Sequence, residues 1–281
     1  MSCTDRIIPC ALDEDIGTGD ITTDGIIDDA LLASAAIIMK ENAVVSGMEV
    51  VRRVFLTVDP AIQFEPLVRD GQAVQKGEVI ANLTGKARSL LKGERCALNF
   101  LMRLSGIATL TRAFTLAIEG TGVVLLDTRK TTPGLRALEK HAVRTGGGKN
   151  HRFGLFDGVL IKDNHIKASG SVGEAVKRMK HVVPYHTIEV EVRTLGELNE
   201  AMLAGADIVM LDNMPVETMK QALELVKGKA LTEVSGNVTL ENIRDIARIR
   251  PDFISTGAIT HSARAIDISM KLTTIYTKET P

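Results

Sequence analysis

Six short apolar runs dominate the second half of the chain and lead into polar segments. The runs span 123–127, 159–162, 188–192, 208–212, 231–235 and 253–255. Helical segments lie between them; from Val216 to Val226, for example, apolar residues recur with the period of an amphipathic helix. Strand, helix and strand repeating about every 20 residues predict βαβ units, which build a parallel sheet. A closed barrel of eight such units takes about 250 residues, so the roughly 160 present here predict an incomplete barrel.

The chain before residue 110 has a different pattern. Strand-like runs occur at 35–39, 62–68 and 79–83. A helix is predicted near 47–56, and 70–80 has the paired glycine turns of a compact β-module. Apolar residues at helical spacing predict a long helix from about residue 90 to about residue 118. We expect the open side of the barrel to be covered by this N-terminal module or by a second subunit.

Positive charge is concentrated around the first two strands of the predicted barrel. Nine lysines and arginines against three acids give residues 129–167 a charge of +6, whereas the whole chain carries −1. Fixed cations beside a glycine loop suit the capture of a small, multiply charged anion. A nucleic-acid binder would carry a more extended positive surface. The charge pattern therefore favours a small-molecule ligand and argues against nucleic acid.

The carboxyl ends of the predicted strands carry the residues that are candidates for chemistry, because barrel enzymes place their active sites there. The first two ends, 127–130 and 162–165, are cationic, and the next two, at Glu191 and Asp212, are carboxylate-rich. This division predicts an organic anion on one side and a metal-linked phosphate on the other. The loops after the last two strands, at 235–236 and 255–257, suit a phosphate.

Individual side chains at these ends have specific expected roles. Glu189 and Glu191 lie two residues apart on one predicted strand, so their side chains face the same way. Together with Asp212 they predict a Mg²⁺ site. The alternative is a structural ion-pair network with Lys130 and Lys162. The guanidinium groups of Arg129 and Arg152 suit bidentate hydrogen bonds to carboxylates. Lys130 and Lys162 supply movable point charges.

Two further features near the basic segment have alternative interpretations. His151 could donate a hydrogen bond to a carboxylate or be structural. Gly146–Gly148 could present backbone N–H groups to an anion.

Three cysteines, Cys3, Cys10 and Cys96, lack metal-ligand spacing, and Cys96 is expected to be buried rather than nucleophilic. With no signal peptide or membrane span predicted, we expect a cytoplasmic protein with reduced thiols.

Seven segments form a set of motifs in a fixed order along the chain. They are 12–20 (LDEDIGTGD), 93–99 (GERCALN), 104–109 (LSGIAT), 127–136 (DTRKTTPGLR), 146–152 (GGGKNHR), 160–166 (LIKDNHI) and 260–262 (THS). Over nearly its whole length the chain closely resembles the quinolinate phosphoribosyltransferase family (carboxylating nicotinate-nucleotide pyrophosphorylases). One departure is Asn237, where the family usually has a second glycine; Asn also tolerates a left-handed backbone.

The resemblance implies an α/β fold in three parts. An N-terminal α/β sandwich domain would occupy 1–109 and include the start of a long linking helix. An open α/β barrel of about seven strands, with the active site, would occupy 110–265. A C-terminal helix over 266–281 would pack back on the N-terminal domain. The family also implies a homodimer whose active sites combine both subunits.

The resemblance implies transfer of phosphoribosyl from phosphoribosyl pyrophosphate to quinolinate with decarboxylation, a step of NAD biosynthesis. Quinolinate would be held by Arg129, His151, Arg152 and Lys162, with Arg95 reaching over from the partner subunit. Phosphoribosyl pyrophosphate and Mg²⁺ would engage catalytic residues Lys130, Glu191 and Asp212, the last two as metal ligands. Ser235, Gly236, Ser255, Gly257 and His261 would line the phosphate side.

Three other functions are compatible with parts of the sequence. A related molybdenum-transport-associated protein of the same fold would act on another acceptor, although the cluster of basic residues favours quinolinate. A Schiff-base aldolase would use Lys162 on its strand end. A lipoyl-type carrier would display Lys76 in the glycine turn of the β-module.

Overall fold

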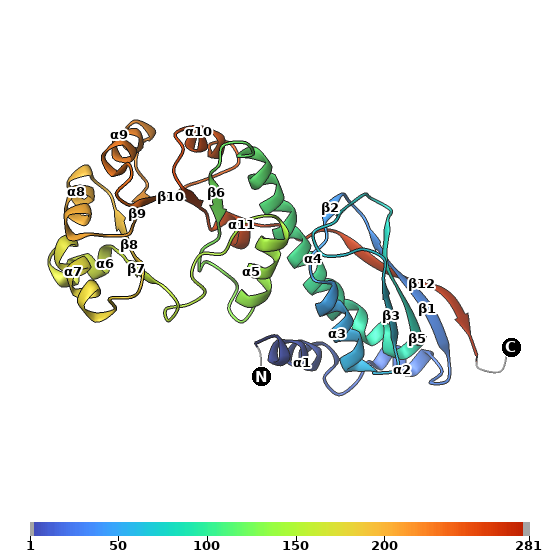
Figure 1. The fold of residues 1–281 in the computed structure, drawn as a ribbon. Coiled ribbons are helices and arrows are strands. Elements are labelled where there is room, and N and C mark those ends of the chain that lie inside the picture. Colours follow the sequence, from blue (N-terminus) through green and yellow to red (C-terminus); the bar gives the residue numbers. More distant parts are fainter. Residues whose placement is uncertain (1–2, 278–281) are drawn as a thin grey trace. The chain divides into compact units, whose positions relative to one another are not determined.

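The computed structural model describes residues 3–277, which form two compact units. The first unit extends to Arg112 and also includes Thr131–Gly147 and the chain from Ser262 onward. The second unit consists of Ala113–Lys130 and Gly148–His261. The long helix α4 (Ala87–Ala117) begins in the first unit and ends in the second (Figure 1).

The first unit is built on an antiparallel sheet with the strand order β12-β1-β5-β3. Its strands are β1 (Leu32–Met39), β3 (Gln63–Pro66), β5 (Val79–Lys86) and β12 (Ile268–Tyr276). A second, two-stranded sheet pairs β2 (Ala43–Val44) with β4 (Ala73–Val74). The helices are α1 (Cys3–Ile16), α2 (Ile21–Ile26), α3 (Met48–Val58), most of α4, and α5 (Arg136–Thr145). Val51, Val54 and Phe55 of α3 are fully buried, which makes this helix part of the core of the unit.

The predicted C-terminal helix is wrong, because residues 268–276 form strand β12. Met270 lies opposite Ile37 in an antiparallel pairing along β1. Ile268 and Met270 are buried, whereas Ser269 between them is partly exposed, which is the alternation of a half-buried strand. The segment does return to the N-terminal unit, as expected, but by adding a strand to its sheet.

The second unit contains a parallel sheet of six strands in the order β6-β11-β10-β9-β8-β7. The strands are β6 (Val124–Leu126), β7 (Val159–Ile161), β8 (Ile188–Val192), β9 (Ile208–Asp212), β10 (Leu231–Ser235) and β11 (Phe253–Ser255). The helices are α6 (Asp163–Ser169), α7 (Val172–Val182), α8 (Leu195–Ala204), α9 (Val216–Val226), α10 (Ile243–Arg248) and α11 (Ala258–His261). Because the first strand pairs with the last, the sheet curls into a barrel that stays open between β6 and β7.

The incomplete barrel predicted from the sequence is confirmed. The described residues give six strands rather than about seven, and an isolated parallel bridge from Lys149 to Leu126 continues the sheet beyond β6. Within residues 3–277, no helix is both long and apolar enough to cross a bilayer.

Candidate active site

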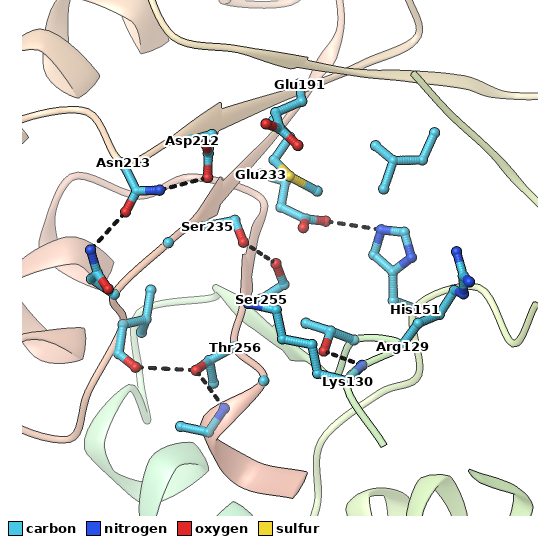
Figure 2. A pocket seen from close by; sticks show the side chains of 18 of the residues that line it. Arg129, Lys130, His151, Glu191, Asp212, Asn213, Glu233, Ser235, Ser255 and Thr256 are labelled. Carbon is cyan, nitrogen blue, oxygen red and sulfur yellow. Dashed lines mark hydrogen bonds and ion pairs between the residues drawn. The ribbon is translucent and has the colours of Figure 1, made fainter. Parts of the chain in front are cut away.

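A pocket of about 720 Å³ opens at the carboxyl ends of the barrel strands (Figure 2). Parallel strands bring their carboxyl ends to one edge, so residues far apart in sequence meet there. Twelve of the residues predicted for the site line this pocket: Arg129, Lys130, His151, Arg152, Lys162, Glu191, Asp212, Ser235, Gly236, Ser255, Gly257 and His261. Two predicted residues do not line it: Arg95 lies exposed on α4 in the first unit, and Glu189, predicted for the Mg²⁺ site, is buried next to His151.

The basic side of the pocket brings two arginines close together. The pKa of Arg152 is lowered, first by partial burial of its guanidinium and then by the positive charge of Arg129. The Nη1 of Arg152 donates a hydrogen bond of 3.0 Å to the carbonyl oxygen of Gly158, which orients the guanidinium. Like charges held together at a pocket wall favour a bound anion, because an anion relieves their repulsion.

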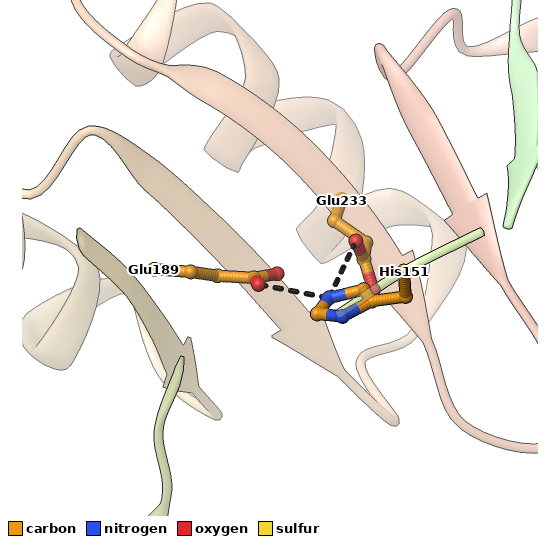
Figure 3. Close-up of side chains that lie close together, drawn as sticks. All are labelled: His151, Glu189 and Glu233. Carbon is orange, nitrogen blue, oxygen red and sulfur yellow. Dashed lines mark hydrogen bonds and ion pairs between the residues drawn. The ribbon is translucent and has the colours of Figure 1, made fainter. Parts of the chain in front are cut away.

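His151 lies next to two buried glutamates, Glu189 and Glu233 (Figure 3). Its Nε2 is 2.9 Å from Glu189 Oε2 and 3.7 Å from Glu233 Oε2. Its Nδ1 accepts a hydrogen bond of 2.8 Å from the backbone N–H of Arg152. An Nδ1 that accepts cannot carry a proton, so the imidazole is neutral and its proton lies on Nε2, directed at Glu189. Its role as a donor to a substrate carboxylate therefore stays a prediction.

Glu233 retains a proton at neutral pH. Its side chain is 1% exposed. Burial, and then the charge of Glu189, raise its pKa to about 8. His151, Glu189 and Glu233 bring three potential metal-ligand atoms within 4.8 Å of one another. The proton on Glu233 removes one of the two buried negative charges, and the Nε2–H of His151 is directed at the carboxylate of Glu189, so one net negative charge remains in this cluster.

The acidic side of the pocket is formed by Glu191 and Asp212. Burial, and then the charge of Asp212, raise the pKa of Glu191. Arg193 bridges the two carboxylates: its Nη2 is 3.1 Å from Glu191 Oε1 and its Nε is 3.2 Å from Asp212 Oδ2. Lys162 Nζ lies 3.8 Å from Glu191 Oε2. The alternative to a Mg²⁺ site was an ion-pair network of these carboxylates with Lys130 and Lys162. The structure contains the pair of Lys162 with Glu191, and both residues line the pocket.

The loops after β10 and β11 form the third wall of the pocket. Ser255 Oγ donates a hydrogen bond of 2.9 Å to Ser235 Oγ, which ties the two strand ends together. A Cβ placed on Gly257 would lie 2.7 Å from Cδ of Lys130 and 2.9 Å from Cδ2 of His261. Glycine at this position therefore lets the stem of Lys130 pass close to α11.

Two other sequence interpretations are decided by the structure. The anion-binding interpretation of Gly146–Gly148 is wrong for its first two N–H groups, because Gly146 and Gly147 donate to Ala142 and Arg144 at the end of α5. Cys96 is 5% exposed, and burial raises the pKa of its thiol to about 11, which confirms that it is packed rather than nucleophilic.

Two residues of this region were given no role from the sequence. Glu233 shares a face of β10 with Ser235, so the two-residue period that selected Glu189 and Glu191 could also have identified it. Arg193 directly follows β8, and no sequence pattern indicated a role for it. That role depends on the distance between Glu191 and Asp212, which the sequence does not give.

The fold and the pocket place this chain in a recognisable class. It has an incomplete α/β barrel with a basic and an acidic wall at its strand ends, and two family models of a phosphoribosyltransferase match its sequence. The model of the quinolinate phosphoribosyl transferase N-terminal domain matches residues 20–105, and that of the C-terminal domain matches residues 107–271. The chain belongs to the quinolinate phosphoribosyltransferase family.

Individual relatives resemble the chain over almost its full length. A Bacillus subtilis protein named "Probable nicotinate-nucleotide pyrophosphorylase (carboxylating)" is 45% identical over 92% of this chain and 90% of its own. A Nicotiana tabacum quinolinate phosphoribosyltransferase (decarboxylating) is 41% identical over 95% of this chain and 82% of its own. The solved nicotinate-nucleotide pyrophosphorylase of Francisella tularensis has a TM-score of 0.92 at 43% identity, covering 96% of both chains.

Proposed function

We propose that this chain transfers the phosphoribosyl group of phosphoribosyl pyrophosphate to quinolinate, yielding nicotinate mononucleotide, pyrophosphate and CO₂. The observation that carries the proposal is the pocket itself, in which two arginines and two carboxylates line one cavity. An aromatic diacid requires a basic wall, and an activated pentose with a metal-linked pyrophosphate requires an acidic wall. The reaction requires the two walls next to each other.

The basic wall is the proposed site of quinolinate. Arg129 and Arg152 would each grip a carboxylate through two N–H groups, and Lys162 would add a third positive charge. The lowered pKa of Arg152 supports this assignment, because partial burial and then the positive charge of Arg129 disfavour its charged form, which a bound carboxylate would stabilise. His151 would help to shape this end of the cavity, with Glu189 and Glu233 fixing its ring.

The acidic wall is the proposed site of the pentose and of Mg²⁺. Glu191 and Asp212 offer carboxylate oxygens, the ligand type that Mg²⁺ prefers, so the residues present fit this ion. When bound, Mg²⁺ would supply charge neutralisation to the departing pyrophosphate. Lys130, Ser235, Gly236, Ser255, Gly257 and His261 would surround the phosphates. Arg193 would have to release Glu191, Asp212 or both when the ligand binds, and its third carboxylate partner, Asp163, lies 3.7 Å from its Nη1.

The chemistry that these residues would perform is positioning and electrostatic stabilisation. As the bond from the anomeric carbon to pyrophosphate breaks, that carbon becomes positive, and the carboxylates of Glu191 and Asp212 would stabilise it. Lys130 would stabilise the departing oxygens. The pyridine nitrogen of quinolinate then attacks the carbon. The positive charge of the resulting pyridinium stabilises the electron pair left on the ring carbon when the 2-carboxylate leaves as CO₂, and that carbon then takes a proton from water.

The proposal includes a cytoplasmic homodimer with shared sites. Arg95 is exposed on α4, and in a dimer a partner's copy of this arginine would complete the basic wall. Mixing an Arg95→Ala protein with an Arg129→Ala protein should restore activity, because each hybrid dimer has one site with both arginines. No recovery after verified subunit exchange would contradict shared sites. Cell fractionation tests the location.

The reaction is tested by incubating the purified protein with pyridine-2,3-dicarboxylate, phosphoribosyl pyrophosphate and Mg²⁺. Nicotinate mononucleotide and CO₂ should form in equal amounts. An Arg152→Ala variant serves as the matched negative control, since it should fold but bind the diacid poorly. Consumption of phosphoribosyl pyrophosphate without these products, or with another acceptor only, would contradict the proposal.

A further inference from the structure

Two asparagine side chains form a directed hydrogen-bond chain that ends on Asp212. Nδ2 of Asn213 donates to Asp212 Oδ1 at 2.9 Å, and Nδ2 of Asn237 donates to Oδ1 of Asn213, also at 2.9 Å. Figure 2 shows the bond from Asn213 to Asp212. A carboxylate can only accept, so Asn213 must turn its NH₂ group toward it. The oxygen of Asn213 then faces Asn237, which must donate in turn, so the carboxylate determines the orientation of both amides.

The backbone around these amides is built to hold them. Asn213 and Asn237 have φ angles of 54° and 50°, and Gly236 has a φ of 92°. Any Cβ on Gly236 would overlap the side-chain amide of Asn213, so glycine leaves the space in which that amide lies. The side chain of Asn242 donates to the carbonyl oxygen of Asn237 at 2.9 Å and anchors the far end. Left-handed backbone in residues other than glycine is unfavourable and persists where the surroundings impose it.

The two oxygens of Asp212 have different partners. Oδ1 receives the amide of Asn213, whereas Oδ2 receives Nε of Arg193 at 3.2 Å. The amide chain joins Asn213, which directly follows β9, to the loop that follows β10, whereas Arg193 is 53% exposed and carries a long, adaptable side chain. Oδ2 is therefore the oxygen that can exchange its partner for a ligand while Oδ1 keeps the carboxylate in orientation.

We propose that Asn237 is a positioning residue that acts through Asn213 to fix the orientation of the Asp212 carboxylate for the sugar-pyrophosphate ligand. The inference rests on the proposed role of Asp212 at the acidic wall. It adds that the residue at 237 tunes binding on this wall without touching the reacting atoms. Bonds in such a chain polarise one another, so losing the outer amide weakens the inner bond.

The test measures the affinity of phosphoribosyl pyrophosphate with Mg²⁺, without acceptor, by calorimetry. Asn237→Gly keeps the left-handed backbone and deletes only the amide; we expect affinity to fall about 3- to 10-fold. Asn213→Gly should cause a larger loss, because it removes the bond to the carboxylate itself. The double variant should match Asn213→Gly alone, since an outer amide has no effect once the inner one is gone.

Controls separate this role from a general effect on the loop. Arg250 also has a positive φ, of 59°, and does not line the pocket, so Arg250→Gly reports the effect of added backbone freedom alone. Quinolinate affinity should be unchanged in Asn237→Gly. The melting temperature of Asn237→Gly should change by no more than the melting temperature of Arg250→Gly changes.

Each contrary outcome overturns a defined part of the reasoning. Additive losses in the double variant would show that Asn237 acts independently of Asn213 and would refute the chain. Unchanged affinity in Asn237→Gly, while Asp212→Asn binds weakly, would refute the role of Asn237 and leave the acidic wall intact. Unchanged affinity in Asp212→Asn would refute the role of Asp212 and with it this inference, whereas product formation by the unaltered protein would still support the reaction.

Discussion

Replacing Glu233 by Gln should stabilise the protein at neutral pH and change the pH dependence of its stability. Burial and the charge of Glu189 raise the pKa of Glu233 to about 8 from its ordinary value of 4.5. Between these values the folded state holds a proton that the unfolded chain has released. The stabilisation is therefore complete below about pH 4.5 and is lost progressively as the pH rises toward about 8. A glutamine of similar shape never ionises, so the variant does not show this loss of stability as the pH rises.

The expected size follows from the raised pKa. One pKa unit corresponds to about 1.4 kcal/mol, so the free energy of unfolding should fall by up to about 1.4 kcal/mol per pH unit in this range. Glu189 shares the same buried charge, which reduces the net effect of Glu233. From about pH 5 to about pH 7.5, we expect the variant to gain about 2–3 kcal/mol relative to the unaltered protein.

Chemical unfolding at several pH values measures this difference. Glu224→Gln is the matched control, because Glu224 is 77% exposed on α9 and its exchange should leave the pH dependence unchanged. Parallel pH profiles for the unaltered protein and Glu233→Gln would refute the conclusion that Glu233 is buried with its proton. A gain of equal size in the control would refute it as well.

Three further changes test the walls of the pocket. Arg152→Ala should weaken quinolinate binding about 100-fold or more while leaving sugar-pyrophosphate binding largely intact; calorimetry showing equal losses would contradict this. Arg193→Ala should strengthen Mg²⁺ binding about 3- to 10-fold, because the ion no longer competes with a guanidinium for Glu191; weaker binding in a Mg²⁺ titration would argue that Arg193 assists the ion. Gly236→Ala should lower the melting temperature and weaken phosphoribosyl pyrophosphate binding, because its methyl group would displace the Asn213 amide; unchanged values for both would contradict the packing described here.

The barrel could be predicted from the sequence because buried parallel strands are continuous apolar runs. The run at 188–192 coincides with β8 (Ile188–Val192), and the run at 208–212 coincides with β9 (Ile208–Asp212). Knowing where strands end was enough to select most of the residues that line the pocket, since strand ends meet at one edge. The resemblance added Arg95, which no local pattern would have selected.

Other features depend on partners that are distant in sequence. Strand β12 pairs with β1, more than 220 residues earlier, and local periodicity does not identify such a partner. The ion pairs of Arg193 and the proton on Glu233 depend on distances between neighbouring strand ends, which a sequence does not contain. The triplet Gly146–Gly148 resembled an anion loop because glycine also suits the end of a helix.

The central claim is that one basic wall holds an aromatic diacid next to an activated pentose. A crystal structure of the protein soaked with pyridine-2,3-dicarboxylate tests it most directly. We predict the diacid against Arg129, Arg152 and Lys162, with its ring nitrogen directed toward the acidic wall at Glu191. An empty basic wall at saturating diacid, or a diacid bound away from these residues, would contradict the account.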